Sequence, residues 1–286
     1  MSTMELPLVV GVDGSEPSLR AVDWAADEAA LRGLPLRVVY ASLWERYEGT
    51  TGLADAVGKP FEEVRAEDIV EAAARRAHER RPEVKAVTDV LAEEPEYALV
   101  RESRTAAAVV LGSRGRSSLT EAVLGSVSVT VAGHAHCPVI VLRGSHDNRV
   151  RPGERPVAVG VGDRPGDTAA VRFAVEEARR RGVPLEAVRA WRRPAHDTEP
   201  VQQHEERAAR ELDAALRDVP ADVEVRRRTV EGPARRVLPD VAAGAGLLVV
   251  GARRREGHFG LQLGRVAHAV LHQAGCPVAV VPEPAE

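Results

Sequence analysis

Residues 6–14 read LPLVVGVDG, and residues 155–163 read RPVAVGVGD. The two stretches start 149 residues apart (155 minus 6), and each combines a short apolar run with a Gly-Val pair. A second block that begins at Gly112 returns at Gly251, 139 residues later (251 minus 112), so the second copy is ten residues shorter in its middle. A period of this length indicates a duplicated domain and not a solenoid of short repeats.

Strands and helices alternate in both copies. Short apolar runs predict strands at 6–12, 36–42, 84–91, 107–112 and 138–142, and then at 156–161, 185–191, 223–230, 247–251 and 277–281. Helical periodicity predicts helices at 19–31, 61–81, 95–104 and 119–135, and then at 168–181, 205–216, 234–243 and 261–274. This order predicts an α/β fold with two tandem doubly wound, mainly parallel five-stranded sheets of Rossmann-like type.

The same pattern predicts the domain limits and the cellular location. We expect domains at 1–143 and 155–286, joined by the polar, Gly- and Pro-containing linker 144–154. The net charge of −4 disfavours binding to a nucleic acid backbone. No apolar run approaches the roughly 20 residues that span a bilayer, and the N-terminus lacks signal-peptide features, so we expect a cytoplasmic protein that binds no membrane.

The two cysteines and the histidine pairs give weaker signals. Cys137 and Cys276 occupy equivalent places before the last strand of each copy, and we expect small buried hydrophobes there, with redox sensing as the alternative. His268 and His272 stand i, i+4 on a predicted helix, but no third ligand accompanies them. We interpret them as a surface pair and predict no metal site.

Candidate binding residues follow the first and fourth strands of the first copy. In a doubly wound sheet, ligands bind beyond the carboxyl ends of the strands, where the strand order reverses. Asp13 offers an acceptor for an amino group or a sugar hydroxyl there. The glycine- and arginine-containing run 112–118 and the pair Gly125-Ser126 offer backbone amides, positive charge and a hydroxyl to phosphate. The alternative is a tight strand-to-helix turn with solvated arginines.

The spacing Gly112-x2-Gly115-x9-Gly125-Ser126 closely resembles the nucleotide-binding signature of the universal stress protein family. The flanking residues LGSRGRSSLTEAVLGSVS, at 111–128, and the opening VVGVDGS are also similar to the family pattern. The resemblance covers essentially the whole chain as two tandem domains. It implies a nucleotide site made of Gly11, Val12, Asp13, Ala41, Leu111, Gly112, Arg114, Gly115, Arg116, Gly125, Ser126 and Val127.

The resemblance also implies roles for these residues. Asp13 would hold the ribose or adenine side, with Gly11, Val12 and Ala41 lining the base pocket. The residues that would surround the phosphates are Leu111, Gly112, Arg114, Gly115, Arg116, Gly125, Ser126 and Val127. The ligand would be ATP, with or without Mg2+, and the first choice among functions is a cytoplasmic ATP-binding regulator of the stress response.

Other functions and partners stay open at this point. A slow ATPase or a nucleotide-dependent transferase on the same site is the alternative, although no base is identified at the phosphates. A third reading is a structural partner protein whose first copy is also empty. The family resemblance implies pairing of the fifth strands, which would make an intrachain pseudo-dimer. A homodimer and an unknown regulatory protein partner are further expectations.

The second copy departs from the signature at the positions that would carry chemistry. Asp13, Gly115 and Ser126 are replaced there by Gly162, Arg254 and Arg265. An acceptor, a close backbone approach and a small hydroxyl are therefore lost together. We interpret the second copy as a domain that kept its fold and lost the usual site. The alternative is a changed anion site built on Arg253, Arg254 and Arg265.

Overall fold

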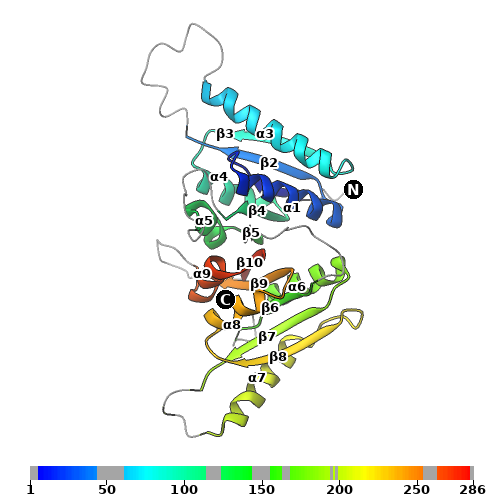
Figure 1. The fold of residues 1–286 in the computed structure, drawn as a ribbon, viewed down its shortest axis with the longest axis vertical. Helices are drawn as coiled ribbons and strands as arrows, with labels where there is room; N and C mark the ends of the chain where they lie inside the picture. The colour runs from blue at the N-terminus through cyan, green and yellow to red at the C-terminus, as the bar shows by residue number, and fades with distance from the viewer. Residues whose placement is uncertain are drawn as a thin grey trace. The chain divides into compact units, whose positions relative to one another are not determined.

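The computed structural model shows two compact units, Met1–Leu142 and Arg143–Glu286, and each contributes parallel strands flanked by helices. Figure 1 traces both along the chain. The structure describes residues 6–43, 61–113, 124–143, 155–162, 168–193, 196, 199–253 and 263–283.

The first unit is a parallel sheet with the strand order β3-β2-β1-β4-β5. Its strands are β1 (Leu8–Gly11), β2 (Leu36–Ala41), β3 (Ala86–Leu91), β4 (Ala108–Gly112) and β5 (Val139–Leu142). Its helices are α1 (Glu16–Arg32), α3 (Phe61–Arg80), α4 (Pro95–Glu102) and α5 (Ser126–His134), with a short 3-10 turn at Ser103–Thr105. Helix α1 packs with α3 and α4 packs with α5, so helices cover both faces of the sheet (Figure 1).

The second unit repeats this architecture with the strand order β10-β9-β6-β7-β8. Its strands are β6 (Val157–Gly160), β7 (Leu185–Trp191), β8 (Val225–Glu231), β9 (Leu247–Arg253) and β10 (Val278–Glu283). Its helices are α6 (Thr168–Arg181), α7 (Val201–Ala215), α8 (Ala234–Ala242) and α9 (Arg265–Gln273). Two doubly wound parallel sheets confirm the predicted fold class.

Strands β1, β4 and β6 are apolar along their whole length because helices bury them from both sides. Leu8, Val9 and Val10 of β1 are at most 1% exposed, and β4 is buried throughout. Helix α1 begins at the Ser15 cap, whose Oγ accepts from the amide of Ser18, and it ends at Gly33 with a left-handed φ of 68°. These local signals place the start of α1 directly beyond the end of β1.

Several helices begin at other residues than the sequence predicts. The prediction of one helix over 119–135 is wrong at Leu124 and Gly125, which are not helical, and α5 begins at Ser126. Residues 119–123 of that prediction lie outside the described residues. Gly125 has extended backbone angles, φ −66° and ψ 145°, which ends the loop and starts the helix one residue later. The same holds at Gly264 before α9. Ser126 is therefore the first residue of a helix, where backbone amides lack partners within the helix.

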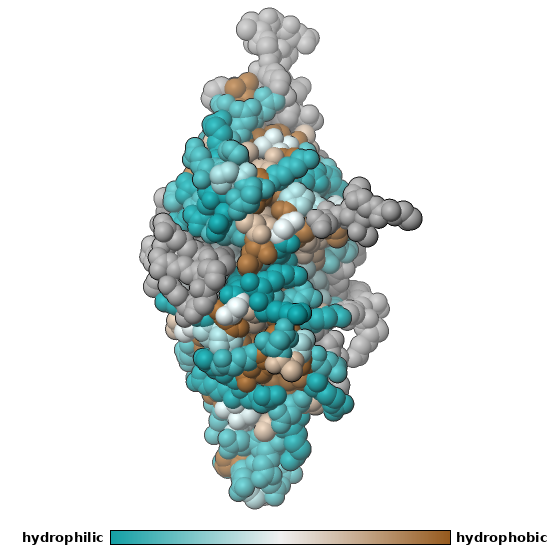
Figure 2. Space-filling view, turned by 90° about the vertical axis from the view of Figure 1, so that its right-hand side faces the viewer, coloured by the Kyte–Doolittle hydropathy of each residue, from teal (hydrophilic) through white to brown (hydrophobic). Residues whose placement is uncertain are grey.

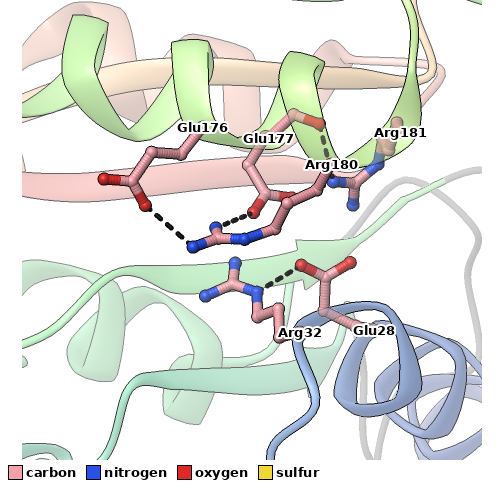
Figure 3. A network of polar contacts seen from close by, with 6 residues as sticks. All are labelled: Glu28, Arg32, Glu176, Glu177, Arg180 and Arg181. Carbon is pink, nitrogen blue, oxygen red and sulfur yellow. Dashed lines mark hydrogen bonds and ion pairs between the residues drawn. The ribbon is translucent and has the colours of Figure 1, made fainter.

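Each unit also contains a buried ion pair at equivalent positions of its first helix. In α1, Arg32 Nε donates to Glu28 Oε1 at 2.5 Å, and in α6, Arg181 donates to Glu177 (Figure 3). Both glutamates are fully buried. Arg180 also contacts Glu177 at 3.3 Å. These two acidic residues are thus buried in the protein and do not lie on a solvated helical face.

The surface is mostly hydrophilic in the view of Figure 2. Within the described ranges, the large apolar side chains with substantial exposure are Leu6, Val64, Val87, Tyr97 and Val201. No helix in those ranges combines the length and the apolar character needed to cross a membrane.

Candidate functional site

The strand order of the first unit reverses at β1, which pairs with β2 on one side and with β4 on the other. Because the strands are parallel, their carboxyl ends meet at one edge of the sheet. That edge brings together most of the residues predicted from the sequence. Gly11, Val12 and Asp13 close β1, Ala41 closes β2, and Leu111 and Gly112 close β4. This is the location where doubly wound sheets bind ligands.

The Asp13 side chain is held in place at the end of β1. Its Oδ1 accepts from the backbone amide of Ser15 at 3.0 Å and from the Ser15 hydroxyl at 2.6 Å. Asp13 is half-buried. The turn that leads into α1 therefore orients a carboxylate at the edge of the sheet, as an acceptor for a sugar hydroxyl or an amino group requires.

Two hydrogen bonds attach the start of α5 to the end of β4. The amide of Gly125 donates to the carbonyl of Ser113 at 2.9 Å, and the buried Ser128 hydroxyl donates to the carbonyl of Gly112 at 2.7 Å. These bonds place Ser126, which is exposed, and the half-buried Val127 beside the carboxyl end of β4. A helix N-terminus in this position favours an anion through its unpaired amides and its dipole.

Close packing explains why glycines occupy the ends of the strands. A Cβ at Gly112 would lie 2.7 Å from the carbonyl oxygen of Pro17, at the first turn of α1. A Cβ at Gly11 would lie 2.7 Å from Leu111 and 3.2 Å from Leu99. The equivalent Gly160 meets Leu238 at 2.7 Å. Packing alone thus explains why these glycines occur in both units, so they do not by themselves indicate a ligand.

Glu96 is a candidate site residue that the sequence does not reveal. It lies in the first turn of α4, and its Oε1 accepts from the Ser126 hydroxyl at 3.3 Å. Thirty residues separate the two along the chain, and the packing of α4 on α5 brings them together. An acidic residue at the start of a short predicted helix is common, because it complements the helix dipole. Nothing in the sequence therefore distinguished this one.

Three of the predicted residues are not placed. They are Arg114, Gly115 and Arg116, which lie in residues 114–123, outside the described part of the chain. Arg254 of the second unit also lies outside the described residues. The predicted phosphate loop between β4 and α5 is consequently known only from its two ends, Ser113 and Leu124.

The second unit carries opposite charge where the first has the Glu96–Ser126 pair. Leu99 and Leu238 pack against the equivalent glycines 11 and 160, which fixes an offset of 139 for this helix (238 minus 99). Glu96 then corresponds to Arg235, just as Ser126 corresponds to Arg265. Both arginines are exposed, one in the first turn of α8 and one at the start of α9. The second unit therefore has two guanidinium groups where the first has a carboxylate and a hydroxyl.

An internal carboxylate occupies the start of α6. Glu283, the last residue of β10, accepts from the amide of Ala169 at 3.1 Å and from the amide of Ala170 at 3.0 Å. Glu283 is 4% exposed, and its Oε1 lies 3.0 Å from where a Cβ of Gly251 would be. The amides at this helix terminus are thus already paired with an anion from the same chain.

The two cysteines and the His268–His272 pair are the remaining candidates. Burial raises the pKa of both the Cys137 and the Cys276 thiol to about 12, and both cysteines are free. The prediction of small buried side chains there is confirmed. The His268 and His272 rings lie 4.4 Å apart, and partial burial, His268 and Arg143 lower the pKa of His272. Among the described residues, no three His, Cys, Asp or Glu side chains gather as metal ligands would.

Comparison with known proteins agrees with this architecture. A family model described as the universal stress protein family matches residues 6–143 and 154–282. A universal stress protein of Mycobacterium tuberculosis is 36% identical over 297 residues, covering 96% of each chain. The crystal structure of a universal stress protein from Archaeoglobus fulgidus has the same fold, with a TM-score of 0.68 at 18% identity over 97% of this chain and 98% of that one. Another structure, of the universal stress protein from Archaeoglobus fulgidus in complex with dAMP, is 26% identical and covers 49% of this chain and 98% of its own, with a TM-score of 0.38.

Proposed function

This chain belongs to the universal stress protein family, and on that premise we propose that its N-terminal unit binds ATP as a regulatory ligand. The proposal rests on the positions of Asp13 and Ser126, which both lie at the edge of the sheet where the strand order reverses. One offers an oriented carboxylate and the other a hydroxyl at a helix N-terminus. Acceptor and donor therefore lie beyond the carboxyl ends of two neighbouring strands, β1 and β4.

We assign the parts of the nucleotide as the family resemblance implies. Asp13 would accept from the ribose or the adenine, and Gly11, Val12 and Ala41 would line the base. The start of α5 would hold the phosphates with its amides and with Ser126. The residues Arg114, Gly115 and Arg116 would complete the phosphate loop. The matching half of the second unit would not bind ATP, because Gly162 and Arg265 stand in place of Asp13 and Ser126.

We propose the same domain limits as above, 1–143 and 155–286 with the linker 144–154, and a cytoplasmic protein. Within its own unit β5 pairs with β4, and β10 pairs with β9. The outer sides of β5 and β10 are the surfaces that a pseudo-dimer of the two domains would use. The regulatory output would pass to a protein partner, and a homodimer is the further assembly we propose to look for.

Slow ATP hydrolysis is the second candidate function, and Glu96 is the observation that favours it. A carboxylate beside Ser126 is a candidate base for a water at the phosphates. Steady phosphate release above background from the full chain that disappears in Glu96→Gln would establish turnover. Release at the background rate leaves ATP binding alone as the function.

The test of ATP binding uses the full chain and isothermal titration calorimetry. We expect one ATP per chain, and we expect the double variant Asp13→Asn, Ser126→Ala to bind no detectable ATP. Loss of one charged or buried hydrogen-bond partner costs roughly 1–3 kcal/mol, about fivefold to 150-fold in affinity. The matched control is Arg265→Ala in the second unit, which should leave the affinity unchanged. A stoichiometry near two, or unchanged binding by the double variant, would refute the proposal.

A further inference from the structure

The hydroxyl of Ser15 makes two contacts at once, one inside the start of α1 and one with Asp13. Its oxygen accepts from the amide of Ser18 at 3.4 Å, which caps the helix, and its proton goes to Asp13 Oδ1 at 2.6 Å. A serine hydroxyl has one proton and two lone pairs, so it can make both contacts together. The residue that caps α1 is therefore also a donor to the carboxylate at the end of β1.

These contacts set the direction in which the Asp13 carboxylate points. The amide of Ser15 donates to the same oxygen, Oδ1, at 3.0 Å, so two donors of one residue meet one carboxylate oxygen. Gly14 has a left-handed φ of 78°, and this turn brings Ser15 back to the side chain of Asp13. A hydroxyl bond to a carboxylate is shorter and stronger than one between neutral groups. The hydroxyl of Ser15 thus contributes strongly to the orientation of Asp13.

The backbone of Asp13 is held by a different residue. Its amide donates to Ser18 Oγ at 3.4 Å, and the Ser18 hydroxyl donates to the carbonyl of Ser15 at 2.8 Å. The carbonyl of Ser15 remains whatever side chain stands there, so a substitution of Ser15 keeps this connection. Loss of the Ser15 hydroxyl should consequently release the Asp13 side chain while its backbone stays in place.

The second unit has neither member of this pair. Gly162 and Arg164 stand at the positions of Asp13 and Ser15, at the constant offset of 149 (164 minus 15). The carboxylate at the start of its first helix comes instead from Glu283 of the last strand, which is 4% exposed, whereas Asp13 is half-buried. A carboxylate that a ligand can reach, held by a serine, thus accompanies the intact nucleotide signature.

We propose that Ser15 is a positioning residue for ATP recognition in the N-terminal unit, and that its hydroxyl holds the Asp13 carboxylate in the orientation that accepts from the nucleoside part of ATP. The proposal rests on the proposed ATP site and adds the residue that prepares its acceptor. Without the hydroxyl, the carboxylate has to be ordered when ATP binds, and that ordering lowers the affinity.

The experiment measures the ATP affinity of full-chain variants by titration calorimetry, and their stability by urea denaturation. Ser15→Gly removes the hydroxyl but keeps most of the capping strength, because glycine is a favourable N-cap residue. We expect it to lower ATP affinity about fivefold to 30-fold with little change in the urea midpoint. Ser15→Thr keeps both the hydroxyl and the cap, and should bind ATP within about twofold of the wild type.

Ser103→Ala is the matched control. It removes a buried hydroxyl that donates to the carbonyl of Val100 at 2.6 Å and accepts from the amide of His136 at 2.8 Å, beyond the C-terminal end of α4. This variant should be less stable in urea and keep the wild-type affinity for ATP. The double variant Asp13→Ala, Ser15→Gly tests the route through Asp13, and it should bind ATP as weakly as Asp13→Ala alone.

The outcomes separate the inference from the function beneath it. Unchanged ATP affinity in Ser15→Gly, or equal losses in Ser15→Gly and Ser15→Thr, would overturn the role of the hydroxyl and leave the ATP site standing. An equal loss in Ser103→Ala would also overturn it, because affinity would then follow stability. Losses that multiply in the double variant would show that Ser15 does not act through Asp13. A wild-type chain that binds no ATP would overturn the proposed function, and this inference with it.

Discussion

Replacement of Glu283 by alanine should loosen the start of α6. The two oxygens of this buried carboxylate accept from the amides of Ala169 and Ala170. Both amides belong to the first turn of the helix, where no carbonyl within the helix can pair with them. The substitution removes both acceptors at once and also removes a negative charge from the positive end of the helix.

The expected cost follows from these contacts. A hydrogen bond to a charged group contributes about 1.5–3 kcal/mol, and a charge at a helix terminus adds about 0.3–1 kcal/mol. Water that enters the site and relaxation of the helix end offset part of this sum. We therefore expect Glu283→Ala to lower the local opening free energy by about 2–4 kcal/mol. Glu283→Gln keeps one acceptor oxygen and should lose about half of that.

Amide hydrogen exchange of the full chain, followed by mass spectrometry, reports this opening directly. A loss of 2–4 kcal/mol should speed exchange at the start of α6 by roughly 30-fold to several hundredfold. Exchange of α1 in the first unit should not change, and Glu206→Ala, at an exposed position of α7, serves as the surface control. Less than threefold acceleration in Glu283→Ala, or equal effects of alanine and glutamine, would refute the reasoning.

Three further predictions concern other parts of the molecule. Gly115→Leu should weaken ATP binding more than Arg116→Ala in titrations at ~0.15 M salt. A side chain at residue 115 would block the approach of the phosphates to the backbone, whereas salt screens an exposed contact between arginine and phosphate. A larger loss of affinity in Arg116→Ala would contradict this prediction. The Cys137 and Cys276 thiols, with pKa values of about 12, should resist a thiol reagent at pH 8 until urea unfolds the chain; fast labelling of the folded protein would count against their burial. Gly112→Ala should lower the free energy of unfolding in urea by about 1–3 kcal/mol, because the added Cβ would overlap the first turn of α1. Gly264→Ala should lower it much less, because no atom lies within 4 Å of the added Cβ. Equal losses in the two variants would show that packing does not set the cost.

The parallel sheets could be predicted because the signal for them is local. A strand buried on both faces has to be apolar along its length, and β1, β4, β6 and residues 247–250 of β9 show that directly in the sequence. The partners of Ser126 and of the α6 amides could not be predicted. Glu96 and Glu283 reach them only after helices and strands far apart in the chain have packed, and their own sequence surroundings are ordinary.

The predicted helix boundaries were wrong for a related reason. Residues 119–135 contain enough helix-forming side chains to favour one continuous helix. The extended conformation of Gly125 follows instead from its contact with Ser113 at the end of β4. Tertiary contacts decide such positions, and local propensity is a weak guide there. The burial of Glu28 was missed likewise, since a glutamate four residues before an arginine usually marks an exposed face.

The buried Glu28–Arg32 and Glu177–Arg181 pairs bear on how the two halves could diverge after duplication. Removal of one partner from a buried ion pair costs about 3–5 kcal/mol where no other charge compensates the one that remains, whereas joint replacement by apolar residues can be neutral. Single substitutions in such a pair are therefore more costly than substitutions at an exposed position. The exposed edge where Ser126 became Arg265 carries no such cost. Buried ion pairs inherited from the duplicated domain are therefore retained more readily than exposed residues. They preserve the fold of each half, while the residues at the exposed binding edges can be replaced.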